Sequence, residues 1–250
     1  MTKRCLGKYW SFSRISTFDN CPYEFKLTYI DNIDGESNVF AEYGTFVHSI
    51  LEKLYKGELT VFDLVNYYDE HYKEKVVSEF PPYIDADKYY QTGRAYFENY
   101  EPITSKYDVV GVEKRVNIDI EGNRFMGIID LLLKDKETGE FIVYDHKSKS
   151  GFKSKKELKK YARQLYLYAY YVKQKYNVLP SKLVFNLFRK GEEVEINFNE
   201  KEYENTLKWF KDEIEAIKTT AEDGFNQKAE ADFYCKNLCN VRMWCEKGVE

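Results

Sequence analysis

Two carboxylates and a lysine stand out because strand-like apolar runs position them. Asp130 interrupts the run FMGIIDLLL, while Asp145 and Lys147 close the run FIVYDHK. Side chains two residues apart on a strand project to the same face, so Asp145 and Lys147 share one. Residues 134–140 read as a hairpin loop that would return the second run beside the first, with Asp130 facing Asp145. Such a group can hold a divalent metal ion and position a water for phosphodiester hydrolysis, although Asp-x-Lys also fits a solvated turn with a surface ion pair.

Four further polar residues lie in patterned segments. His48 falls in an amphipathic helical pattern, where a lone histidine is usually structural or exposed. Glu113 falls in a strand pattern and fits a surface position on an edge strand equally well. Gln164 and Tyr168 are four residues apart on a predicted helix, so they share a face. By itself that pair is an ordinary amphipathic detail.

A dense basic block covers residues 147–163, where eight lysines and arginines are opposed by one glutamate. Lys149, Lys153 and Lys160 belong to it. Because the chain as a whole carries a net charge of −4, this local stripe is a candidate track for phosphates. A solvated helix face explains the block equally well.

Three cysteines near the C-terminus, Cys235, Cys239 and Cys245, follow the spacing C-x₃-C-x₅-C. This density indicates a metal site, and Cys21 is the best fourth ligand because Cys5 lies in an unpatterned N-terminal segment. Four thiolates suit a [4Fe–4S] cluster or zinc. Zinc ribbons mostly use C-x₂-C knuckles, so the spacing favours iron–sulfur. Unconnected buried or surface thiols are the alternative.

The composition fits a soluble cytoplasmic protein. The 250 residues suit one large domain, 43% hydrophobic residues allow a sizeable core, and 32% are charged. No apolar stretch approaches ~18 residues, and the N-terminus has no apolar signal segment, so neither a membrane span nor secretion is expected. In a reducing compartment the five cysteines should be thiols or metal ligands.

Hydrophobic periodicity predicts helices first and a mixed α/β region after them. The predicted helices cover residues 13–30, 39–56, 60–78, 85–101, 154–175 and 200–222. The predicted strands cover residues 107–120, 124–134, 140–146, 182–189 and 192–198. The core order of three strands, a helix and two strands indicates an α/β domain with a mixed sheet.

Taken together and in order, the motifs resemble the RecB-type branch of the PD-(D/E)XK nuclease superfamily. They are most similar to its iron–sulfur members, the CRISPR-adaptation nucleases, the AddB-type exonuclease domains and the nuclease domain of eukaryotic replication helicase-nucleases. The matching segments are SFSRISTF before Cys21, GTFVH with His48, GIID with Asp130, YDHK with Asp145, QLYLY from Gln164, and the cysteine triad. Two features depart from the usual pattern: C-x₃-C replaces C-x₂-C, and Asp145 stands where glutamate is also used.

The resemblance implies a restriction-endonuclease-like α/β core whose central mixed sheet is flanked by helices. It also implies one nuclease unit over residues 1–250. A helical region at 1–105 would contain Cys21 and His48, and a catalytic core would span 106–200. A C-terminal helix and cysteine-rich tail at 201–250 would close the Fe–S site.

The resemblance also implies roles for the site residues. His48, Asp130 and Asp145 would bind Mg²⁺ or Mn²⁺, the main-chain carbonyl of His146 would be a further ligand, and Glu113 would approach a second metal ion. Lys147 would orient or deprotonate the attacking water. DNA contacts would come from Gln164, Tyr168, Lys149, Lys153 and Lys160. The [4Fe–4S] ligands, with zinc as the alternative, would be Cys21, Cys235, Cys239 and Cys245.

The implied activity is a metal-dependent DNA exonuclease, with endonuclease activity in some settings, that acts on single strands or DNA ends. The setting would be CRISPR adaptation, repair and recombination, or phage DNA metabolism. Because the chain has no G-x₄-G-K-[ST] motif, the protein would act without its own ATP motor or borrow one. A helicase or integrase is the kind of protein partner implied, and some relatives form oligomers. Two alternatives stay open. One is a catalytically silent Fe–S module for DNA or a partner, and the other is a zinc-stapled domain with a coincidental Asp-x-Lys.

Overall fold

The computed structural model describes residues 8–229 and 232–246. Within that part the chain forms two compact units. The larger unit comprises residues 39–116 and 128–200. The smaller unit comprises the described residues up to 38, the segment 117–127 and the described residues from 201 onward. None of the described helices is long and apolar enough to cross a membrane.

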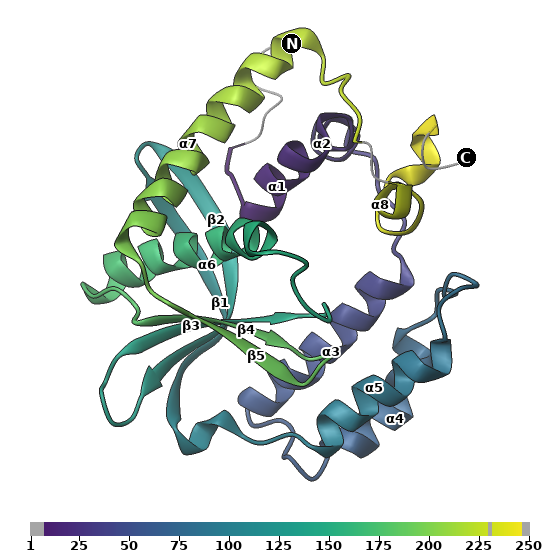
Figure 1. Ribbon diagram of the computed structural model, residues 1–250, viewed down its shortest axis with the longest axis vertical. Coiled ribbons are helices and arrows are strands. Elements are labelled where there is room, and N and C mark those ends of the chain that lie inside the picture. The colour runs from purple at the N-terminus through teal and green to yellow at the C-terminus, as the bar shows by residue number, and fades with distance from the viewer. Residues whose placement is uncertain (1–7, 230–231, 247–250) are drawn as a thin grey trace. The chain divides into compact units, whose positions relative to one another are not determined.

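The β-structure is one five-stranded sheet in the order β1–β2–β3–β4–β5 (Figure 1). Its strands are β1 (Tyr107–Ile120), β2 (Asn123–Asp135), β3 (Phe141–Lys147), β4 (Lys182–Leu187) and β5 (Glu192–Asn197). β3 pairs antiparallel with β2 and parallel with β4, which pairs antiparallel with β5. A parallel pair needs a long crossover, and helix α6 (Lys155–Tyr176) supplies it. The mixed α/β sheet predicted from the sequence is confirmed.

Strand β3 is the most deeply buried strand, because it lies in the middle of the sheet and has apolar or aromatic residues at its first four positions. Alternate residues of β2 and β3 reach one face, as the two-residue period of a strand requires. Helix α6 packs on β3 and β4 through a buried stripe at Leu165, Ala169 and Val172, which has helical spacing. The cluster on one face of the sheet contains Leu131, Leu133, Ile142, Tyr144 and Val184.

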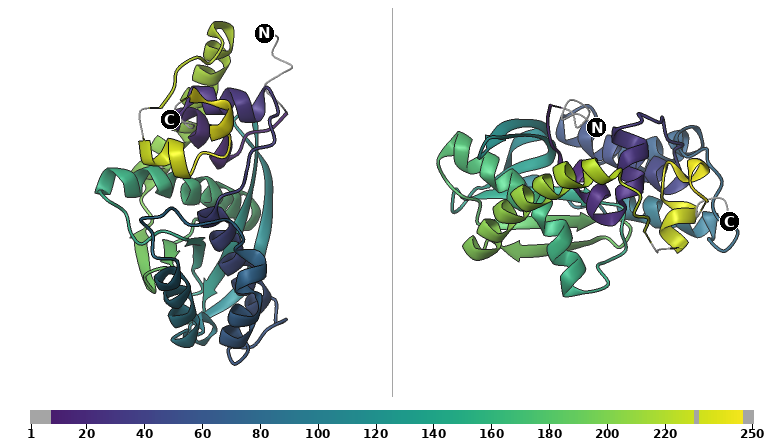
Figure 2. Two further views of the ribbon diagram at one scale, coloured as in Figure 1. Left: turned by 90° about the vertical axis from the view of Figure 1, so that its right-hand side faces the viewer. Right: turned by 90° about the horizontal axis from the view of Figure 1, so that it is seen from above.

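Three helices of the larger unit lie side by side (Figures 1 and 2). Their buried side chains form one aromatic-rich core. The helices are α3 (Val39–Tyr55), α4 (Leu64–Lys75) and α5 (Ala86–Glu98). Tyr43 and Tyr68 are fully buried between them. A methyl group at Gly93 of α5 would lie 2.3 Å from Tyr68 Oη and 2.6 Å from Tyr43 Oη, so the close packing depends on glycine there. The 3₁₀ helix η2 (Ile103–Ser105) then leads into β1.

The prediction of one helix over residues 13–30 is wrong. The structure has two helices, α1 (Phe12–Asn20) and α2 (Pro22–Tyr29), separated at Cys21. Cys21 is extended, with φ −155° and ψ 102°. Proline lacks an N–H and disfavours helical backbone at the residue before it, so Pro22 suits the first turn of α2 and would disrupt a helix that continued through Cys21.

In the smaller unit the C-terminal segment lies against the stretch after α2. Its elements are most of α7 (Glu200–Asp223), α8 (Asp232–Asn237) and the 3₁₀ helix η3 (Arg242–Trp244). The main-chain N–H of Glu36 donates to the carbonyl of Asn240 at 2.8 Å. A Cβ at Gly35 would lie 2.8 Å from Asn240 Cβ, which shows how closely the two backbones approach. Cys5 lies outside the described residues.

Candidate functional site

The two predicted carboxylates lie on neighbouring strands at the same level of the sheet. Leu131 of β2 pairs with Tyr144 of β3, and one more step of that antiparallel register brings Asp130 beside Asp145. The main-chain N–H of His146 donates to Asp130 Oδ2 at 2.7 Å. The hairpin inferred from the sequence therefore does bring the two halves of the constellation together.

Lys147 lies between a carboxylate and an amide. Its Nζ is 2.7 Å from Asp145 Oδ2 and donates to Gln164 Oε1 of α6 at 3.0 Å. The amide of Gln164 in turn donates to Tyr168 Oη at 3.1 Å, which fixes the orientation of that amide. Asp145 is only 1% exposed, and the Lys147 ammonium is the cation that faces its Oδ2.

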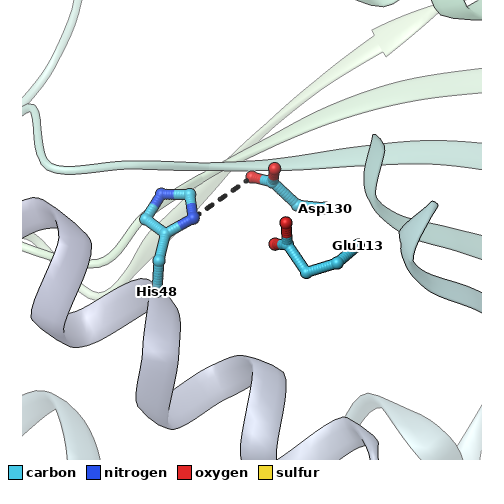
Figure 3. A group of neighbouring side chains, drawn as sticks. All are labelled: His48, Glu113 and Asp130. Carbon is cyan, nitrogen blue, oxygen red and sulfur yellow. Dashed lines mark ion pairs between the residues drawn. The ribbon is translucent and has the colours of Figure 1, made fainter. Parts of the chain in front are cut away.

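His48 reaches the same point from helix α3 (Figure 3). Its Nδ1 lies 3.6 Å from Asp130 Oδ2, and its Nε2 lies 2.9 Å from the main-chain oxygen of His146. One turn earlier, a Cβ at Gly44 would lie 3.3 Å from Ser148 Oγ. The absence of a side chain at Gly44 thus lets α3 approach the segment after β3 and brings His48 into range.

Glu113 completes the group from strand β1 (Figure 3). One ligand atom each of His48, Glu113 and Asp130 lie within 4.8 Å of one another. Glu113 has φ +46°, a left-handed conformation in the middle of a strand. A residue in this conformation interrupts the strand's alternation and redirects its side chain, as bulges next to active sites do, at a cost of about 1–3 kcal/mol.

Burial and like charges disfavour the ionised carboxylates of this group. Burial, and next the charge of Asp145, raise the pKa of Asp130 well above its usual range. Burial, and next Glu52, raise the pKa of Glu113. Burial lowers the pKa of His48, which favours the neutral imidazole that can bind a metal. Carboxylates, one imidazole and a main-chain oxygen form a donor set that suits Mg²⁺ or Mn²⁺.

Buried polar side chains of Asn186 and Tyr96 form a hydrogen-bond network that orients the His146 ring. Burial lowers the pKa of its imidazole well below the usual range, so the ring is neutral. Asn186 Nδ2 lies 2.9 Å from His146 Nδ1 and donates to Tyr96 Oη at 2.7 Å. The amide nitrogen can only donate, so Nδ1 of the neutral His146 ring accepts and the proton is on Nε2. Sequence reasoning missed Asn186, although a lone amide in the apolar strand KLVFNL was a signal.

The basic residues proposed as DNA contacts lie beside the site and do not join the metal-ligand group. Lys149 Nζ lies 2.6 Å from Glu157 Oε1 and 4.2 Å from the centre of the Tyr161 ring. The side chain of Lys153 is exposed just before α6, whereas Lys160 is half-buried on α6. Their role in DNA binding remains a prediction.

The four predicted cysteine ligands line one small pocket of the smaller unit, and all four are free thiols. Cys21 Sγ accepts hydrogen bonds from the main-chain N–H groups of Glu24 at 3.4 Å and Ala229 at 3.3 Å. Burial, and next the charge of Glu24, raise the pKa of Cys239 to about 12. Tyr234 Oη donates to both oxygens of Glu24, at 2.8 and 2.9 Å. Without a bound cation, Cys239 is therefore a neutral thiol.

Comparisons with known proteins give one family. Residues 9–246 match the sequence profile of the PD-(D/E)XK nuclease superfamily. The crystal structure of a Eubacterium rectale protein, described as a presumed exonuclease, aligns with 98% of this chain and 93% of its own at 12% identity and a TM-score of 0.54. The crystal structure of the protein SSO0001 aligns with 83% of this chain and 98% of its own at 17% identity and a TM-score of 0.37. No curated protein matches at a significant level.

The likeness to the Eubacterium rectale protein concerns the fold alone, because the identity is only 12%. The family profile, in contrast, spans nearly the whole chain, including both strands of the carboxylate site. The chain belongs to the PD-(D/E)XK nuclease superfamily.

Proposed function

We propose that this nuclease is a metal-dependent DNA exonuclease that acts on single strands or DNA ends. The observation that carries the proposal is the convergence of His48, Glu113 and Asp130 within 4.8 Å, next to the Asp145–Lys147 pair. His48, Asp130, Asp145 and the main-chain oxygen of His146 would hold Mg²⁺ or Mn²⁺, and Glu113 would reach a second ion. The bound ion would lower the pKa of a water and neutralise charge on the phosphate.

Lys147 would orient the attacking water and stabilise the charge that develops on the phosphate. Its position supports this role, because Asp145 and Gln164 fix the ammonium group from two sides. A donor that is already oriented costs no reorganisation in the transition state. Gln164 therefore acts first through Lys147, and its partner Tyr168 would hold the DNA backbone close by.

A cleavage assay on end-labelled single- and double-stranded DNA tests the proposal. Wild type should release label with Mg²⁺ or Mn²⁺ and be inactive in EDTA. Asp145→Ala should lose about a thousandfold or more in rate while staying folded. The matched control is Asp108→Ala. Asp108 is an exposed carboxylate on β1, and its Oδ1 lies 3.9 Å from Lys136 Nζ in a weak ion pair. Equal rates for folded Asp145→Ala and wild-type protein would refute the mechanism.

For the cysteine pocket we propose a [4Fe–4S] cluster held by Cys21, Cys235, Cys239 and Cys245. The four free thiols line one pocket, which supports a shared metal group. The spacing C-x₃-C-x₅-C favours iron–sulfur over zinc, because zinc ribbons mostly use C-x₂-C knuckles. The N–H groups that donate to Cys21 Sγ also suit a cluster ligand.

Metal analysis of the purified protein separates the two cofactors. We expect four iron and four sulfide ions per chain in the wild-type protein. Each cysteine-to-alanine variant should lose the iron, the sulfide and stability. If the protein instead contains one zinc ion and no sulfide, the cluster proposal is wrong and the four cysteines hold a structural zinc ion. Tyr23→Phe, in the same pocket but without a thiol, is the control that should keep full iron content.

We further propose that residues 1–250 act as one nuclease unit, with a helicase or integrase supplying DNA in CRISPR adaptation, repair or phage DNA metabolism. The alternative is a catalytically silent Fe–S module for DNA or a partner. The combination of Asp130, Asp145 and Lys147 in contact geometry favours the enzyme, because a module without catalysis has no need of it.

A further inference from the structure

The larger unit contains a second cavity whose lining includes none of the proposed metal ligands. It has a volume of about 620 Å³, within the range of small-molecule sites in proteins. Its walls come from α5 and the segment after it, from Tyr144 of β3, and from the β4–β5 hairpin with residues 188–193. The nuclease proposal assigns no role to this cavity.

The cavity combines aromatic rings with carboxylates. The rings are those of Tyr96, Tyr100, Tyr144 and Phe188, and the carboxylates are those of Glu101, Glu192 and Glu193. The lining also contains two cations, Arg189 and Lys190, which are outnumbered by the three carboxylates. Arg189 contacts a tyrosine ring, and Lys190 pairs with one of the carboxylates. The Arg189 guanidinium lies 4.2 Å from the centre of the Tyr89 ring, and Lys190 Nζ lies 2.7 Å from Glu192 Oε2. The lining therefore keeps a net negative charge.

One acceptor in the cavity wall has no hydrogen-bond donor among the described residues. Asn186 is only 4% exposed, and its Nδ2 serves both His146 Nδ1 and Tyr96 Oη. Its Oδ1 makes no hydrogen bond to any described residue. This oxygen keeps contact with solvent, so a ligand that brings an N–H group can replace water as its donor.

We propose that this cavity binds an organic cation, an ammonium or guanidinium group on a short apolar stem. Aromatic faces attract such cations, the carboxylates neutralise their charge, and their N–H groups suit Asn186 Oδ1. A phosphate or nucleotide is disfavoured, because the lining would repel its charge. The source is a free amine or guanidine, or the lysine or arginine side chain of a basic peptide.

Calorimetry with two compounds of nearly equal shape tests the charge requirement. Butylguanidinium carries the cation, and butylurea replaces it with a neutral group. We expect butylguanidinium to bind with 1:1 stoichiometry and at least about tenfold more tightly than butylurea. Equal affinities, or no binding of butylguanidinium, would overturn the proposal. The source is identified by comparing an N-acetylated arginine peptide amide with agmatine. Tighter binding of the peptide indicates a peptide side chain, and tighter binding of agmatine indicates a free guanidine.

Two glutamates of β5 provide a matched pair of variants. Glu193 lines the cavity and accepts a hydrogen bond from Tyr144 Oη, whereas Glu195 lies outside it and pairs with Lys182 at 2.9 Å. Glu193→Gln should weaken butylguanidinium binding about tenfold, and Glu195→Gln should leave it unchanged. Equal effects of the two variants would mean a general surface charge effect and would overturn the site. If Glu193→Gln does not fold, Glu101→Gln at an exposed lining position replaces it.

Discussion

At the scale of single residues, the carboxylate site combines side chains that strand alternation directs to one face with two residues, Glu113 and Asn186, that depend on the surrounding structure. Asp130, Asp145 and Lys147 are predictable because apolar alternation fixes their strand faces. The left-handed conformation of Glu113 is not, since no glycine or turn signal occupies that position and only the surrounding sheet can impose φ +46°. The same holds for Asn186, whose importance depends on a histidine 40 residues earlier.

The raised pKa of Asp130 predicts an unusual pH dependence of stability when no metal is bound. The folded-state pKa lies above the ordinary value of 3.8, so the native state binds a proton that the unfolded state has already lost. This group's contribution to stability is therefore full below 3.8 and is lost as the pH rises through the raised pKa. Wild-type protein in EDTA should lose stability over that interval relative to Asp130→Asn.

Thermal unfolding of both proteins in EDTA, from about pH 4 to 8, measures this difference. Asp130→Asn removes the buried charge and should be the more stable protein at the upper end, although it cannot cleave DNA. Saturating Mn²⁺ should raise the melting temperature of wild type more than that of the variant. Parallel stability curves in EDTA would show that Asp130 does not carry the burial cost.

At the scale of helices and strands, periodicity predicted the sheet and α6 to within a few residues, because their apolar patterns are long. The prediction failed at Cys21, where the amphipathic pattern continues past Pro22 but the helix is interrupted. The approach of α5 to its neighbours was also unreadable from the sequence. Gly93 looks like a weak helix residue, yet Tyr68 and Tyr43 leave no room for a methyl group there.

Gly93→Ala should therefore destabilise the protein by about 1–3 kcal/mol, because overpacking outweighs the better helix propensity of alanine. The nearest clash is with the hydroxyl of Tyr68, so Tyr68→Phe should cost less in the Gly93→Ala background than in wild type. Denaturant unfolding of the two single variants and the double variant gives this coupling. Additive changes in the free energy of unfolding would mean that α5 shifts away from Tyr68 as a whole.

At the scale of the whole molecule, the chain has a negative net charge but contains one strongly basic segment. The chain has a net charge of −4, but residues 147–163 carry eight basic groups beside the metal-ligand group. A protein of this kind should depend on a few local phosphate contacts, because its remaining surface repels DNA. The local stripe, more than the net charge, should then set the affinity.

Lys153→Ala tests this argument through the salt dependence of DNA binding. Each phosphate contact contributes about 0.7 to the slope of log K against log salt for single strands. Removing Lys153, which is exposed at the start of the stripe, should lower the affinity for all sequences alike and reduce the slope by about that amount. Lys88→Ala, an exposed lysine of α5 in the same unit, should change neither quantity. Binding measured by fluorescence anisotropy in Ca²⁺, over a range of salt concentrations, distinguishes the two variants. If Lys88→Ala and Lys153→Ala shift the slope equally, the stripe is a solvated helix face and DNA binds by diffuse charge alone.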